Sequence, residues 1–81
     1  MEHRLDAEAR QLLVALAAAP DAPFPDRLMP GEIATRLGFA PGRAWRLLRL
    51  FVELGYYEYE ISAYSGHLTE AGRQAAGDLT T

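Results

Sequence analysis

The chain has 81 residues, enough for one small domain that buries only about 60% of the surface its unfolded chain exposes. It contains no cysteine, which excludes disulfide bonds and thiolate chemistry, and its formal net charge of −3 argues against a uniformly basic nucleic-acid-binding protein. No apolar run approaches the roughly 20 residues of a membrane-spanning helix, and the N-terminus lacks the apolar segment of a signal peptide. We therefore expect a single cytoplasmic domain.

The first predicted helix covers residues 6–19. Asp6 is placed to be its N-cap, because an aspartate carboxylate accepts a hydrogen bond from a free amide of the first turn, and Glu8 adds a favourable charge there. The alanine-rich second half suits close packing against the rest of the domain, which we favour, or against a second subunit of a homodimer. The apolar stripe of this helix consists of Leu5, Ala9, Leu12, Leu13 and Leu16.

Residues 20–29 are dense in proline, which fixes φ and removes backbone donors. We therefore expect an ordered, non-helical connection that Phe24 and Leu28 anchor to the core, with at most a short paired segment near residues 27–29.

Two short helices joined by a tight turn are predicted next, at residues 30–37 and 41–54. Each begins with a proline, which suits the first helical position because the missing amide would have no partner there. Gly38 and Gly55 directly follow the two helices, where a left-handed residue commonly ends a helix.

The helix at residues 41–54 separates apolar from charged side chains. Arg46, Arg49 and Glu53 gather on one side, and Trp45 lies at the edge of the apolar side, where we predict partial burial. Half of the eight arginines share a window that contains no acid: Arg36, Arg43, Arg46 and Arg49. This window predicts one locally positive surface on an acidic body; an ordinary solvated helix face is the alternative.

After Gly55 the hydrophobic period changes from 3.6 to 2, which predicts a β-hairpin. The first strand begins at Tyr57, residues 63–66 form the connection, and residues 67–69 form the second strand. Thr69 is predicted to cap a short last helix. The residues of this helix that we expect to face inward are Ala71, Ala75 and Leu79.

The order of these elements resembles the winged helix-turn-helix DNA-binding domain of MarR-type bacterial transcriptional regulators. The matching pieces are GEIATRLG for the first helix of the motif, RAWRLLRLFVELGYY for the recognition helix and first wing strand, and HLTEAGRQAA for the second wing strand and last helix. The resemblance implies a mostly helical α+β fold, with a three-helix core, a two-stranded wing and a short C-terminal helix.

The resemblance further implies a transcriptional regulator that reads duplex DNA with the helix at residues 41–54. Arg46 is the expected base contact, and Arg49 is expected to meet phosphate. The implied DNA-binding residues are Arg36, Gly42, Arg43, Arg46 and Arg49. The implied wing residues are Tyr64, Ser65 and His67.

Two features depart from the family pattern. The wing carries Glu58 and Glu60 in place of cations, and Ala40 stands where a Ser or Thr commonly caps the recognition helix. These departures leave a second hypothesis open, in which the winged helix docks a protein partner through an aromatic patch on the wing and does not bind DNA.

Enzymatic activity has little support in the sequence. His3 and His67 are not spaced with other ligands as in known metal sites, and no serine lies in a nucleophile-elbow sequence. Glu58 and Glu60 are on an exposed strand, without the pocket that separates the pKa values of catalytic carboxylates. We expect neither catalysis nor a cofactor or metal.

Overall fold

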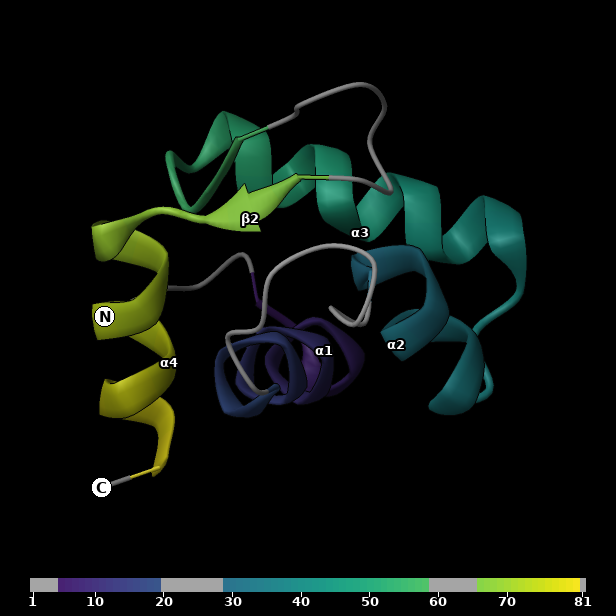
Figure 1. Ribbon diagram of the computed structural model, residues 1–81, viewed down its shortest axis with the longest axis horizontal. Coiled ribbons are helices and arrows are strands. Elements are labelled where there is room, and N and C mark those ends of the chain that lie inside the picture. Colours follow the sequence, from purple (N-terminus) through teal and green to yellow (C-terminus); the bar gives the residue numbers. More distant parts are fainter. Residues whose placement is uncertain (1–4, 20–28, 59–65, 81) are drawn as a thin grey trace.

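The computed structural model describes residues 5–19, 29–58 and 66–80 (Figure 1). Three helices are followed by a two-stranded antiparallel hairpin and a C-terminal helix, so the predicted α+β, mostly helical class is confirmed at this level. In the described ranges, no helix combines the length and the hydropathy needed to cross a bilayer. The elements are α1 (Ala7–Ala18), α2 (Pro30–Arg36), α3 (Pro41–Glu53), β1 (Tyr57–Glu58), β2 (His67–Leu68) and α4 (Glu70–Thr80).

The helix starts follow the local chemistry of the sequence. The amide of Ala9 donates a 2.8 Å hydrogen bond to Oδ1 of Asp6, which confirms the predicted N-cap of α1. Both α2 and α3 begin at a proline and lack a side-chain cap, as their preceding residues Met29 and Ala40 require.

The ends of α2 and α3 have the same geometry. Gly38 and Gly55 adopt φ values of 91° and 80°, a left-handed conformation that other residues adopt only with strain. In both places the glycine amide bonds the carbonyl three residues back, and the next amide bonds the carbonyl five residues back. Each of these Schellman motifs turns the chain sharply. The motif at Gly55 allows β1 to begin shortly after α3 ends.

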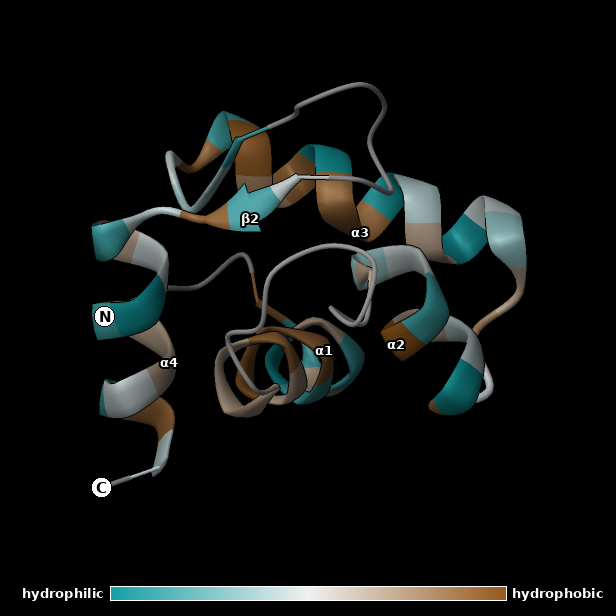
Figure 2. Cartoon of the chain, in the orientation of Figure 1, coloured by the Kyte–Doolittle hydropathy of each residue, from teal (hydrophilic) through white to brown (hydrophobic). Residues whose placement is uncertain are grey.

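The core lies where α1 meets the other helices, as Figure 1 shows in outline and Figure 2 by hydropathy. Phe51 and Tyr57 are its largest buried side chains, and the predicted apolar stripe of α1 is buried throughout. Apart from the tyrosine hydroxyl of Tyr57, no charged or polar side chain of the described residues is buried. The core consists of Leu5, Ala9, Leu12, Leu13, Leu16, Ile33, Ala34, Ala44, Leu47, Leu48, Phe51, Tyr57, Leu68 and Ala76.

The hairpin is short in the described residues. Tyr57 pairs with Leu68 and Glu58 with His67, with Tyr57 buried and Glu58 exposed, as the predicted alternation requires. The amide of Gly66 donates a 2.8 Å hydrogen bond to the buried Tyr57 hydroxyl. The remainder of the predicted wing, residues 59–65, lies outside the described residues and includes Tyr64 and Ser65.

The buried face of α4 differs from the prediction. Ala71 and Leu79 are exposed and Ala75 is half-buried, whereas Gly72 and Ala76 face the interior. The reason is a close approach between backbones: a Cβ on Gly72 would collide with the carbonyl of Tyr56. This contact brings α4 against the start of β1 and thereby sets which side of the helix is buried.

Candidate functional site

The exposed side of α3 is the candidate surface. We define the α3 face as Gly42, Trp45, Arg46 and Arg49, all of which are exposed. The helix presents them outward because its apolar residues, at three- and four-residue spacing, are buried in the core. The predicted division of this helix is therefore confirmed, although the contacts of its cationic residues differ from one another.

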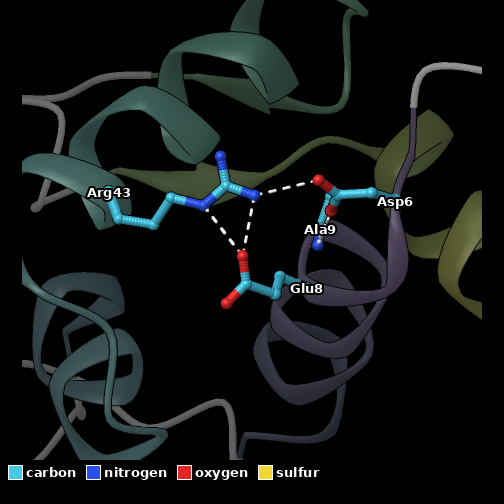
Figure 3. A network of polar contacts seen from close by, with 4 residues as sticks. All are labelled: Asp6, Glu8, Ala9 and Arg43. Atoms are coloured by element: carbon cyan, nitrogen blue, oxygen red, sulfur yellow. Dashed lines mark hydrogen bonds and ion pairs between the residues drawn. The ribbon is translucent and has the colours of Figure 1, made fainter.

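Arg43 is held by two carboxylates of the first helix (Figure 3). Its Nη2 lies 2.9 Å from Oδ2 of Asp6 and 2.8 Å from Oε1 of Glu8, and its Nε donates a 3.0 Å hydrogen bond to the same Glu8 oxygen. We call these three residues the Arg43 clamp. The Arg43 side chain is only 35% exposed, against 60% and 54% for its partners. A residue that we predicted to face DNA thus connects α3 to α1.

The pKa values of Asp6 and Arg43 are both shifted from their ordinary values. The hydrogen bond from the Ala9 amide, followed by the one from Arg43, lowers the pKa of Asp6 below the ordinary aspartate value. The pKa of Arg43 is raised, chiefly by its bond to Asp6 and then by Glu8. All three groups are open to water, which screens their attraction, so the clamp orients Arg43 more than it stabilises the fold.

Arg46 and Arg49 have no such partners. Among the described residues, neither Arg46, Arg49 nor Arg36 has a carboxylate at ion-pair distance. The guanidinium carbon of Arg49 instead lies 4.8 Å from the centroid of the Trp45 ring, a cation–π contact. Arg46 and Arg49 are therefore charges that an anion can approach without displacing an internal carboxylate of the described part of the chain.

Trp45 is more exposed than we predicted. Its relative solvent accessibility is 43%, the largest value for a large hydrophobic residue in the described ranges. The prediction of partial burial failed because Trp45 lies one helical position beyond the buried stripe, on the side of Arg49.

Arg36 belongs to a different part of the surface. It lines a groove of about 560 Å³ between α2 and α3, together with Glu32. The other lining residues are Met29, Gly31, Thr35, Pro41 and Ala44. The four arginines of residues 36–49 are thus divided among a groove (Arg36), the Arg43 clamp and the α3 face (Arg46 and Arg49).

The described part of the hairpin contributes an acid rather than a free cation. Nε2 of His67 lies 3.2 Å from Oε1 of Glu58, its neighbour across the strands, so any charge on His67 is offset locally. Tyr57 is a core residue and Tyr56 is half-buried, so neither adds to an exposed aromatic patch.

Asp6 and Glu8 are the participants that sequence reasoning missed. Asp6 was predicted only as a helix cap, yet it caps α1 through Oδ1 and binds Arg43 through Oδ2. Asp6 and Arg43 are 37 residues apart, and the spacing of charges along a single chain gives no signal for such a pair.

The chain matches no protein-family model, and neither a curated protein nor a solved structure matches it. In the described ranges, no three His, Asp or Glu side chains come close enough together to hold a metal ion.

Proposed function

We propose that the protein is a small winged-helix regulator of transcription that binds duplex DNA with α3. The observation that carries this proposal is the pair of exposed arginines, Arg46 and Arg49, on a helix whose opposite side is fully packed. A two-stranded hairpin and a further helix follow α3 in the order that the family resemblance implies.

In this proposal the residues of the α3 face have separate roles. Arg46 makes the base contact, since a bidentate arginine–guanine contact gives about 1–3 kcal/mol of discrimination between bases. Arg49 meets phosphate, and the amide of Gly42 in the first turn of α3 offers a further phosphate contact, because Ala40 provides no side-chain cap. Arg43 contributes less than the sequence implies, because Asp6 and Glu8 already occupy it.

A second function is favoured by a different observation. The exposure of Trp45 beside two arginines is typical of residues at the centre of protein interfaces. In that case the α3 face docks an acidic protein partner and does not bind DNA.

The test is fluorescence anisotropy with a labelled random-sequence duplex at low and at raised salt. We expect weak binding as a monomer, tighter binding by a dimer, and a loss of affinity as salt rises, because each neutralised phosphate releases counterions. Arg46→Ala should weaken binding more than Arg73→Ala, a matched loss of charge on exposed α4.

Two outcomes would contradict the proposal. Equal losses from both substitutions would mean that α3 is not the reading face. No binding of the wild-type protein at low salt would favour the protein-docking function.

A further inference from the structure

Trp45 and Arg49 form an unusual pair for a surface that contacts only phosphate. The chain has a single tryptophan, and it is the most exposed of the large hydrophobic residues that the structure describes. It is not needed to complete the core, because α3 buries its apolar residues on the other side.

We propose that Trp45 and Arg49 are a stacking platform for an unpaired base, so that the α3 face binds single-stranded nucleic acid more tightly than duplex of the same length. This inference rests on the proposed function in one respect, that the α3 face binds a nucleic-acid backbone. It differs in the form of nucleic acid that the face selects.

The geometry of the pair supports stacking. The guanidinium carbon of Arg49 lies over the indole, 4.8 Å from its centroid, so the ring and the cation are in contact while the Trp45 residue stays 43% exposed. A base stacks on an exposed aromatic ring through its π face, and arginine adds both a cation–π contact and a bond to the adjoining phosphate. In a duplex the bases are already stacked on one another and offer no face to Trp45.

The charge of the surface supports the same conclusion. With Arg43 bound to Asp6 and Glu8, the α3 face has only Arg46 and Arg49 for phosphates, and the described hairpin adds Glu58 beside His67. Two cations neutralise few phosphates, so electrostatic attraction alone gives little affinity. Tight binding then requires a contact that does not depend on charge, and the exposed indole provides it.

The same reasoning distinguishes a nucleic acid from an acidic peptide. A peptide of glutamates supplies negative charge to Arg46 and Arg49 but has no planar group for the indole. A single strand supplies both at once, because its phosphates and bases alternate along a flexible chain.

Because Trp45 is the only tryptophan, its intrinsic fluorescence reports directly on the platform. We would titrate the full-length protein with a single-stranded oligothymidylate, a duplex of the same length, inorganic polyphosphate and poly-L-glutamate. We expect the single strand to quench the fluorescence and the two polyanions without bases to leave it nearly unchanged. We also expect a shallower salt dependence for the single strand than for the duplex.

Variants then separate stacking from charge, with anisotropy of labelled single strand and labelled duplex as the measurement. Trp45→Ala should weaken single-strand binding about tenfold, and Trp45→Phe, which keeps an aromatic ring, should retain most of the affinity. Circular dichroism checks the fold, and we expect it to be intact because Trp45 is exposed and alanine favours helix. Polyphosphate binding should be the same in all three proteins.

The outcomes separate this inference from the proposed function. If Trp45→Ala leaves single-strand affinity unchanged while the duplex binds through Arg46, the platform is wrong and duplex binding stands. If polyglutamate binds as tightly as the single strand and also depends on Trp45, the surface is a peptide-docking site and the platform is overturned. If no nucleic acid binds, both proposals fail.

Discussion

At the scale of single residues, the Arg43 clamp shows how a surface ion pair changes function more than stability. Water screens the attraction between exposed groups, so pairs of this kind contribute little to folding. Yet two guanidinium nitrogens of Arg43 are occupied by carboxylate oxygens, in the positions that phosphate oxygens would take. Asp6 and Glu8 therefore compete with any anionic ligand for Arg43.

Releasing Arg43 should strengthen binding to duplex DNA. In the double variant Asp6→Asn, Glu8→Gln we expect severalfold higher affinity, because one more guanidinium becomes available to phosphate. Asparagine is as good an N-cap as aspartate, so the cap on the Ala9 amide is kept.

The controls for this experiment remove general effects of charge. Glu70→Gln with Asp78→Asn makes the same change in net charge on α4 and should raise the affinity less. Adding Arg43→Ala to the double variant should cancel the gain; if the gain persists, the clamp does not withhold Arg43.

At the scale of the elements, local chemistry predicted where most helices begin and end, but not all of their buried faces. The bounds of α2 and α3 depend on prolines and glycines whose effect is confined to neighbouring residues, and the structure places them within one residue of the prediction. The buried face of α4 depends on the contact between Gly72 and the backbone of Tyr56, which is distant in sequence. The spacing of apolar residues within α4 cannot predict that contact.

The two glycines of α4 should therefore respond oppositely to alanine. In Gly77→Ala the new methyl group meets no atom of the described residues within 4 Å beyond the local backbone of α4, so the free energy of unfolding should rise by about 0.5–1 kcal/mol. In Gly72→Ala the methyl group would collide with the Tyr56 carbonyl. The free energy of unfolding should therefore fall by about 1–3 kcal/mol, although alanine favours helix more than glycine does.

Urea denaturation of the two variants is a matched measurement, because both change the same residue type in one helix. Stabilisation by both substitutions would show that α4 does not approach Tyr56 so closely.

At the scale of the whole molecule, the order of elements was predictable and the partition of the charges was not. The change of period at Gly55 and the apolar stripes are enough to predict three helices, a hairpin and a last helix. The arginines of residues 36–49 share one acid-free window of the sequence, but folding gives them different surroundings: the groove beside α2, the carboxylates of α1, or solvent. Those neighbours come from elements elsewhere in the chain.

Acid should weaken the N-cap of α1 and, with it, the ion pair between Asp6 and Arg43. The pKa of Asp6 is lower in the folded protein than in the unfolded chain, so its contribution to stability is complete at neutral pH and is lost as the pH falls below about 4. We expect the melting temperature of the wild-type protein to fall more steeply between neutral pH and about pH 3 than that of Asp6→Asn. Parallel curves of melting temperature against pH for the two proteins would mean that the pKa of Asp6 is not lowered by folding.

The turn after α3 is also hydrogen-bonded to the start of α4. The Gly55 carbonyl accepts a 2.6 Å hydrogen bond from the Thr69 hydroxyl, the Tyr56 carbonyl accepts a 2.9 Å bond from the Thr69 amide, and the same hydroxyl caps α4 at the Gly72 amide. These hydrogen bonds connect the end of α3 to the start of α4 through Thr69. We expect a tilt of α3 on binding at Arg46 to move α4 with it, and a dye attached near Thr80 would report that movement from outside the α3 face.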